Sequence, residues 1–295
     1  MFGRVLTAMV TPFNDMLEVN YEAAARIAKH LAANGSDGIV VAGTTGETPN
    51  LTKEEKINLF KEVKQAVGNS SKVIAGVGTY STKESVELVN KISGCELDGI
   101  MAVVPYYNKP SQEGLYQHFK AIAEATELPV MLYNIPGRTV INLLPQTVKR
   151  LAEIPNIVCI KEAAGVMDQV SELRSILPDS FAIYSGDDSL TLPMLSLGCS
   201  GIVSVASHLI GNQIKKMIEA FLQGDIHKAL QWHLLLLPVF KGMFIATNPV
   251  PVKYLLNEIG LNAGGYRLPI VGPTASEQAF LKELLSSIQS LPEAI

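Results

Sequence analysis

The strongest constraint on the fold is a series of short apolar runs, rich in valine and isoleucine, that alternate with longer stretches of helical periodicity. These runs are almost continuously apolar, which is typical of parallel strands that are covered on both faces. Eight such strands, each followed by a helix within about 220 residues, predict a (β/α)8 barrel of the α/β class. The expected strands span residues 4–10, 38–42, 72–77, 99–104, 130–133, 157–161, 181–185 and 201–205.

Start and stop signals support the helices between these runs. The helices that begin after Thr52 and Ser81 each carry a glutamate three residues beyond that residue, as in a capping box. Gly35 and Gly94 are expected to end the first and third helices. A doubly wound open sheet is the alternative fold, but no Gly-x-Gly-x-x-Gly turn follows the first strand, so the barrel is favoured.

The segment after Gly224 shows no further strand pattern. Helical stretches at residues 226–245, 250–258 and 275–289 follow a plain loop. We therefore expect a catalytic barrel over residues 1–224 and a small C-terminal α-helical domain over residues 225–295.

Composition argues against several classes of partner. The chain has 24 lysines and arginines against 28 aspartates and glutamates, so no excess of positive charge favours nucleic acid. No apolar run reaches the ~20 residues of a membrane span, and the N-terminal run is too short for a signal peptide. Cys95, Cys159 and Cys199 are odd in number and widely spaced, which indicates reduced thiols and a cytoplasmic protein. The histidines show no ligand spacing, so a catalytic metal is not expected.

Lys161 is the first candidate catalytic residue, because it directly follows the apolar run at residues 157–160. In a barrel, the carboxyl ends of the strands form the mouth that holds catalytic groups. Partial desolvation of a lysine there favours the neutral amine, which is the form that attacks a ketone to give a Schiff base. A lysine paired with a carboxylate at the barrel rim explains this residue alone equally well.

Two further strand ends could bind carboxylates. The turn at residues 43–46 offers backbone N–H groups and the hydroxyls of Thr44 and Thr45, which suits a small carboxylate. Arg138 follows a Pro-Gly turn, where its guanidinium could hold a carboxylate in bidentate fashion. Considered singly, threonines that cap a tight turn and an arginine in a surface ion pair are the more common cases.

Tyr107 and Tyr133 also lie at the ends of predicted strands, and their hydroxyls could pass protons to each other or to Thr44. Each tyrosine taken alone is more often a packing residue whose hydroxyl is satisfied. Asp187 and Asp188 could suggest a divalent metal, but adjacent carboxylates point in different directions and no histidine is close in the sequence. A helix N-cap is the favoured interpretation there.

Several of these strand ends together resemble the signatures of one family. Residues 38–47, 133–139 and 160–163 are similar, in order and spacing, to motifs of the dihydrodipicolinate synthase and N-acetylneuraminate lyase family. Residues 105–119 and 248–253 extend the likeness over essentially the whole chain. The resemblance implies a class I lyase that uses pyruvate through a Schiff base and needs no external cofactor.

Four residues match the catalytic positions of that family. By this resemblance, Lys161 forms the imine with pyruvate, and Tyr133 donates and accepts protons. Thr44 and Tyr107 complete a proton relay, with Tyr107 entering the site of a neighbouring subunit. This implies at least a tight dimer, and the family usually forms a homotetramer.

The resemblance also assigns substrate contacts. Thr45, Gly186 and the main chain of Val203 match positions that bind pyruvate, and Arg138 matches one that receives the carboxylate of L-aspartate 4-semialdehyde. Arg138 and the Thr44–Thr45 pair favour condensation of these two substrates, on the route to diaminopimelate and lysine. Cleavage of N-acetylneuraminate or of a 2-keto-3-deoxy sugar acid is the alternative. A catalytically silent binding barrel is least favoured, since every relay position holds a competent residue.

One set of residues departs from the family pattern. Many members are inhibited by lysine bound in a cleft between subunits, and Glu84 and Tyr106 match residues of that cleft. Lys53, Lys56 and Tyr80 replace its usual histidines and asparagine. Two cations should repel a cationic effector, so we expect weak or absent feedback by lysine.

Overall fold

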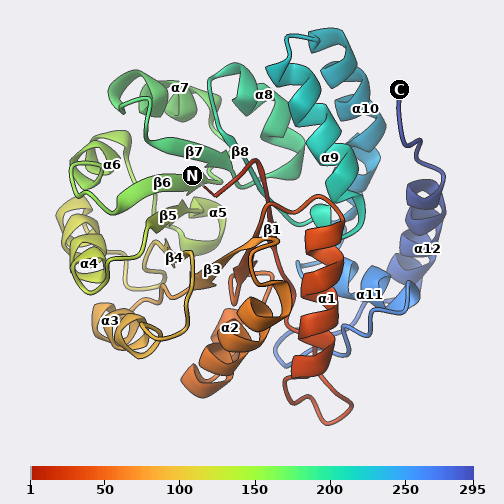
Figure 1. Ribbon diagram of the computed structural model, residues 1–295, viewed down its shortest axis with the longest axis horizontal. Coiled ribbons are helices and arrows are strands. Elements are labelled where there is room, and N and C mark those ends of the chain that lie inside the picture. The colour runs from red at the N-terminus through yellow and green to blue at the C-terminus, as the bar shows by residue number, and fades with distance from the viewer. Residues whose placement is uncertain (1) are drawn as a thin grey trace.

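The computed structural model describes residues 2–295 and contains a closed barrel in which each strand pairs in parallel with the next, and β8 pairs with β1. The predicted (β/α)8 barrel is therefore confirmed, and helices ring the strands on the outside (Figure 1). The strands are β1 (Val5–Ala8), β2 (Gly38–Val41), β3 (Lys72–Gly76), β4 (Gly99–Val103), β5 (Val130–Asn134), β6 (Ile157–Glu162), β7 (Ala182–Ser185) and β8 (Gly201–Ser204).

The connections after the strands contain the barrel helices and three short helical turns. One of these turns, α5, is only four residues long and carries Arg138. The helical elements are α1 (Tyr21–Ala33), η1 (Thr48–Asn50), α2 (Lys53–Val67), α3 (Thr82–Lys91), α4 (Gln112–Glu124), α5 (Pro136–Thr139), α6 (Pro145–Leu151), α7 (Met167–Ile176), η2 (Asp188–Leu190), α8 (Thr191–Ser196) and α9 (Ser207–Leu222).

The predicted helix boundaries are partly correct. Thr52 forms the full capping box at the start of α2, and Gly35 lies just beyond the cap of α1 with a φ of +92°. Ser81 forms only half of its box, because its own N–H is taken by the Thr79 hydroxyl. Gly94 does not end α3: that helix ends at Lys91, and the residue after it serves as the cap.

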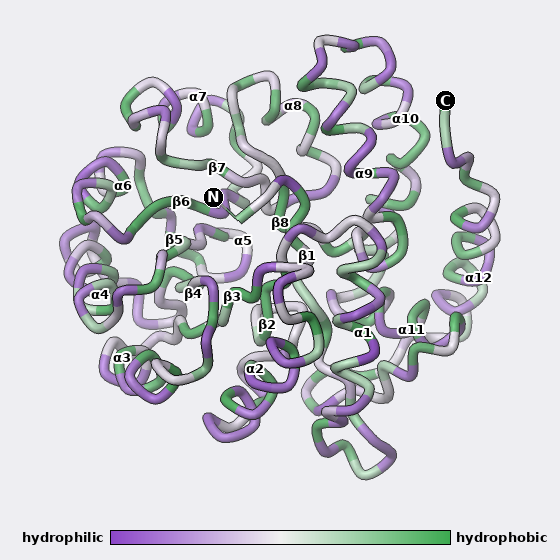
Figure 2. Tube along the Cα trace, viewed as in Figure 1, coloured by the Kyte–Doolittle hydropathy of each residue, from purple (hydrophilic) through white to green (hydrophobic). Residues whose placement is uncertain are grey.

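The apolar side chains form two cores, one inside the barrel and a larger one between the strands and the helices. Along the tube in Figure 2, much of the strand backbone is hydrophobic and each helix alternates hydrophobic with hydrophilic stretches. This pattern places one face of each helix against the sheet, as expected for a barrel packed on both sides. The barrel interior is filled by Leu6, Val40, Ile74, Met101, Met131, Tyr133, Cys159, Tyr184 and Val203, among others.

The segment beyond Gly224 contains three helices, α10 (Ile226–Gly242), α11 (Val250–Glu258) and α12 (Ala275–Gln289). Helix α10 packs along α9, and α12 contacts both α10 and α11. Figure 1 shows these helices at one side of the barrel, next to α9. Among residues 2–295, no helix combines the length and apolarity that crossing a bilayer would require.

Candidate active site

Lys161 and Tyr133 face each other at the mouth of the barrel. They occupy paired positions near the ends of β6 and β5, and the Lys161 Nζ lies 4.2 Å from the centre of the Tyr133 ring. Both residues are buried, with 5 % and 3 % of their surface exposed. No carboxylate within residues 2–295 pairs with Lys161, so the rim ion pair considered from the sequence does not form. The arrangement leaves a buried amine beside a phenol.

Thr44 and Tyr133 line the same small pocket in the mouth of the barrel. The chain enters the Thr44 turn through Ala42, whose φ of +54° bends the backbone sharply after β2. The Thr44 turn shares its pocket with Met101 and Val103 of β4 and with Tyr133 of β5. The remaining pocket residues are Ala42, Gly43, Thr48, Gly76 and Gly78.

Gly186 packs directly against Lys161. A Cβ at this position would lie 2.5 Å from the Cβ of Ala163 and 3.1 Å from the Lys161 Cε. A side chain there would therefore overlap Ala163 and crowd the Lys161 side chain. Val203 lies in β8 with its side chain in the barrel core, so its main chain is what remains for a substrate contact.

Thr45 is buried, and its hydroxyl accepts a hydrogen bond from the Asn248 Nδ2 at 2.9 Å. Asn248 lies just before α11, so the segment after the barrel reaches back to the predicted pyruvate-binding turn. Asn248 belongs to the family motif at residues 248–253, which by itself predicts no role for this side chain. Only the long-range contact reveals it.

A buried ion pair holds the same turn from a second point. The Lys253 Nζ donates to the Glu47 carboxylate at 2.9 Å, and both side chains are fully buried. Burial lowers the pKa of Lys253, whereas the charge and hydrogen bond of Glu47 raise it. Nearby, Arg267 pairs with Glu55 of α2 at 2.6 Å. From the sequence, Glu47 and Lys253 were noted only as members of family motifs and Glu55 only as a capping-box glutamate, so neither ion pair was predicted.

Arg138 lies exposed on α5, and within residues 2–295 its side chain pairs with no carboxylate. The surface ion pair considered for it from the sequence is therefore absent from the described chain. The α5 turn is closed by the Thr139 hydroxyl, which donates to the carbonyl oxygens of Ile135 and Ile141. The guanidinium is thus free to meet an anion at the barrel mouth.

Tyr107 is not part of the pocket formed by this chain. Its side chain is 94 % exposed, and its φ of +74° turns the backbone outward after β4. Within residues 2–295, no hydrogen bond joins its hydroxyl to Thr44 or Tyr133. One chain therefore brings together three of the four predicted catalytic residues, Thr44, Tyr133 and Lys161, and leaves Tyr107 outside.

The Asp187–Asp188 pair follows β7 and serves the backbone. Asp187 caps the η2 turn by accepting from the Ser189 N–H at 2.8 Å, as predicted. Asp188 is buried and accepts from the Ser204 hydroxyl and from the N–H groups of Val205 and Ala206. Burial raises the pKa of Asp188 to about 6. Among residues 2–295, no group of three His, Cys, Asp or Glu side chains is arranged to hold a metal ion.

The cleft in which Lys53, Lys56 and Tyr80 depart from the family pattern lies between α2, α3 and the end of β4. Lys53 pairs with Glu87 at 2.6 Å. Lys56 is buried, and burial lowers the pKa of its ammonium, although the charge of Glu84 opposes this. Tyr80 packs edge-to-face on Tyr106 within the same cleft, with 5.4 Å between the ring centres.

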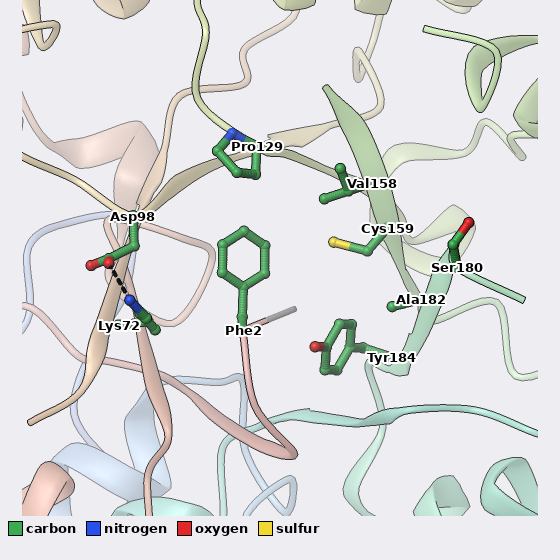
Figure 3. A pocket seen from close by; sticks show the side chains of 9 residues that line it. All are labelled: Phe2, Lys72, Asp98, Pro129, Val158, Cys159, Ser180, Ala182 and Tyr184. Carbon is green, nitrogen blue, oxygen red and sulfur yellow. Dashed lines mark hydrogen bonds and ion pairs between the residues drawn. The ribbon is translucent and has the colours of Figure 1, made fainter. Parts of the chain in front are cut away.

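A larger cavity lies at the opposite end of the barrel. It measures about 370 Å³, against about 20 Å³ beside Thr44 and Tyr133. Figure 3 shows the Phe2 ring in its centre, with Cys159 and Tyr184 beside it. Catalytic groups of a barrel collect at the carboxyl ends of the strands, so size does not identify the active site here.

Comparison with known proteins identifies the family of the chain. The family model for the dihydrodipicolinate synthetase family matches residues 1–288. The 4-hydroxy-tetrahydrodipicolinate synthase of Desulforamulus reducens is 60 % identical over 98 % of each chain, and that of Desulforudis audaxviator is 58 % identical over 98 % of this chain and 99 % of its own.

Solved structures give the same result. The dihydrodipicolinate synthase of Cyanidioschyzon merolae with lysine bound has a TM-score of 0.96 at 49 % identity, over 98 % of this chain and 99 % of its own. A dihydrodipicolinate synthase of Bacillus anthracis has a TM-score of 0.95 at 48 % identity, over 99 % of each chain. The fold, the buried lysine at the barrel mouth and these relatives lead to one conclusion: the chain belongs to the dihydrodipicolinate synthetase family.

Proposed function

We propose that this enzyme condenses pyruvate with L-aspartate 4-semialdehyde to give 4-hydroxy-tetrahydrodipicolinate. The observation that carries the proposal is the buried Lys161 amine, which has no carboxylate partner among residues 2–295 and lies over the Tyr133 ring. The relatives that share about 60 % of the sequence are synthases of this name. The reaction serves diaminopimelate and lysine synthesis.

The first half of the reaction forms the imine. The Lys161 Nζ attacks the keto carbon of pyruvate, and the resulting carbinolamine loses water to leave a protonated imine. Tyr133 supplies and removes the protons of these steps, together with Thr44. The Thr45 turn, Gly186 and the main chain of Val203 hold the pyruvate carboxylate.

The second half makes the new carbon–carbon bond. The imine loses a proton from the former methyl group, and the enamine carbon attacks the aldehyde carbon of the second substrate. The amine of that substrate then adds to the imine carbon and expels Lys161, which closes the ring and restores the free lysine. The balance is one water released, with Arg138 binding the carboxylate of the semialdehyde.

The relay is completed by a neighbouring subunit in this proposal. Tyr107 projects from the surface with 94 % of its side chain exposed, and Val140 and Leu144 are also exposed apolar residues. A second exposed apolar row on α10 comprises Ile226, Leu230 and Leu234. Two such surfaces support a homotetramer built as a dimer of dimers, which sedimentation analysis of the full chain would test.

We also propose that the enzyme is located in the cytoplasm. The three cysteines are free and buried, which suits the reducing conditions of the cytoplasm. Fractionation of the source cells would test this assignment.

Borohydride reduction in the presence of pyruvate tests the chemistry directly. Mass spectrometry should locate a single adduct on Lys161, and an unmodified Lys161 would refute the imine mechanism. Assays with L-aspartate 4-semialdehyde, N-acetylneuraminate and 2-keto-3-deoxygluconate then test the substrate. Turnover of either sugar acid without turnover of the semialdehyde would refute the proposed reaction.

A further inference from the structure

The two residues that follow the catalytic pair form a second pair on the other face of the sheet. Successive side chains of a strand point to opposite faces, so Asn134 and Glu162 point away from the barrel axis when Tyr133 and Lys161 point inward. They are also paired in register between β5 and β6. The Asn134 Nδ2 donates to the two Glu162 carboxylate oxygens at 3.0 and 3.2 Å.

Glu162 is a buried carboxylate surrounded by neutral donors. Only 2 % of it is exposed, and no lysine or arginine within residues 2–295 pairs with it. It accepts from Asn134, from the Gln169 Nε2 at 3.1 Å and from the Ala164 N–H at 2.7 Å. Burial raises the pKa of Glu162, while these hydrogen bonds act to lower it. The catalytic steps proposed above do not use this group.

The carboxylate determines how the neighbouring amides are turned. The hydrogen bonds to Glu162 all come from N–H donors, so its oxygens act as acceptors and draw the NH2 groups of both Asn134 and Gln169 toward them. The carbonyl oxygen of each amide must then face away. The Asn134 Oδ1 accepts from the Leu143 N–H at 2.9 Å, and the Gln169 Oε1 accepts from the Asn142 Nδ2 at 2.7 Å.

These outward-facing oxygens hold the loop that carries Arg138. The loop leaves β5 at Asn134 and returns at Asn142 and Leu143, where the Asn134 side chain also donates to the Asn142 Oδ1 at 2.8 Å. The Asn134 side chain therefore joins the two ends of the loop. Because the Arg138 guanidinium pairs with no carboxylate of the described chain, its place depends on the backbone of this loop.

We infer that Glu162 is a positioning residue for the second substrate: through Asn134, Gln169 and Asn142 it holds the Arg138 loop at the barrel mouth. The inference rests on the proposed role of Arg138 in binding the semialdehyde carboxylate. It predicts a selective effect. The proposed contacts to the pyruvate carboxylate, at Thr45, Gly186 and Val203, lie outside β5, β6 and this loop. Loosening the loop should therefore change the KM for the semialdehyde far more than the KM for pyruvate.

The test compares Glu162→Gln with a rescue variant. The amide of this variant would place an NH2 group next to the N–H donors from which the Glu162 carboxylate accepts, so at least one of these hydrogen bonds would be lost. We expect the KM for L-aspartate 4-semialdehyde to rise about 10- to 100-fold, with the KM for pyruvate changed by less than about twofold. The double variant Glu162→Gln, Gln169→Glu exchanges the amide and the carboxylate across the contact between these two residues. It should reverse most of the rise in the KM for the semialdehyde. Ser171→Ala, an exposed change on α7, is the matched control.

Hydrogen exchange gives a measurement that does not depend on the proposed reaction. Amides of residues 135–144 should exchange faster in Glu162→Gln than in the wild type, and at the wild-type rate in Ser171→Ala. If Glu162→Gln fails to fold, Gln169→Ala serves for the same comparison. Equal increases in both KM values, unchanged KM values, or no recovery in the double variant would overturn the inference. A wild type that traps pyruvate but does not condense it with the semialdehyde would instead refute the proposed function.

Discussion

The two ends of the barrel differ in how their charged groups are satisfied. At the N-terminal end, Asp98 pairs with Lys72 at 2.9 Å (Figure 3) and with Lys64 at 2.8 Å. The Tyr184 hydroxyl there donates to the Gly3 carbonyl. At the C-terminal end, Lys161 has no ion-pair partner among residues 2–295. The larger cavity thus surrounds groups that already have partners, whereas the lysine side chain without an ion-pair partner lies at the end where a ligand is expected.

The same comparison separates stability from activity. Polar groups that are fully paired in the folded chain contribute to folding. Removing one partner leaves the other buried without a hydrogen bond, which costs its desolvation free energy. Groups left without partners contribute little to folding, but they are available to substrate. Substitutions of unpaired groups at the mouth should therefore reduce catalysis, and substitutions of paired groups at the other end should reduce stability.

The largest expected effect is at Lys161. Replacing it with alanine removes the only group proposed to form the imine, so kcat should fall by at least about 10⁴-fold. The melting temperature should change little, because this amine has no ion pair to lose. Activity above that limit, together with borohydride trapping at another lysine, would break the assignment of the mouth as the active site.

Tyr133→Phe should have the next largest effect. The phenyl ring keeps the packing beside the Lys161 side chain but removes the hydroxyl, so kcat should fall by about 10²–10⁴-fold if Tyr133 transfers the protons. Pyruvate should still form the reducible imine, although more slowly. A kcat within a factor of two of the wild type would exclude Tyr133 as the acid–base group.

Arg138→Ala should act on one substrate. Loss of a bidentate charge-assisted contact should raise the KM for L-aspartate 4-semialdehyde by about 10- to 100-fold. The KM for pyruvate should stay close to the wild-type value, and steady-state kinetics with each substrate varied would measure both. An equal rise for the two substrates would contradict the assigned role.

Asp98→Asn tests the opposite end. Two ammonium groups would lose their partner, so the free energy of unfolding should fall by about 1–3 kcal/mol while kcat stays unchanged. Urea unfolding measures the change, and Asp179→Asn, at a fully exposed position, is the control. A large loss of activity at unchanged stability would contradict the division between the two ends.

The pH dependence of the same carboxylate has a definite sign. Burial would raise the pKa of Asp98, but hydrogen bonds from Lys64, the Val73 N–H and Lys72 outweigh it and lower that pKa below 3.8. The folded state then holds this proton more weakly than the unfolded state. The stabilisation from Asp98 is therefore complete above about pH 3.8 and is lost as the pH falls below it, and Asp98→Asn should flatten this part of the stability profile.

The smallest effect is expected in the cleft around Lys56. Lysine added at submillimolar concentration should leave the rate essentially unchanged, because the cleft already holds the ammonium groups of Lys53 and Lys56. A steady-state assay with both substrates measures this. Clear inhibition by submillimolar lysine would contradict the prediction and show that a third region of the surface controls the mouth.

Most of the fold could be predicted from the sequence. Each predicted strand overlaps its observed strand, because nearly continuous runs of branched apolar residues have few other places to be buried. Lys161 and Tyr133 could be placed together for the same reason, since the ends of parallel strands meet at one face. The end of α3 was predicted wrongly, because Gly94 keeps an ordinary φ and the helix ends before it.

The contacts that hold the site depend on the tertiary structure. Lys253 and Glu47 are 206 residues apart, and Asn248 and Thr45 are 203 apart, so no local pattern joins them. Glu162 resembles any charged residue at a strand end until the fold buries it among neutral amides. By itself, the sequence determined which elements form and which face of each is apolar, because these follow from local periodicity. Only closure of the barrel decided which polar groups gain partners and which stay free, because hydrogen bonds and ion pairs depend on distances set by the whole fold.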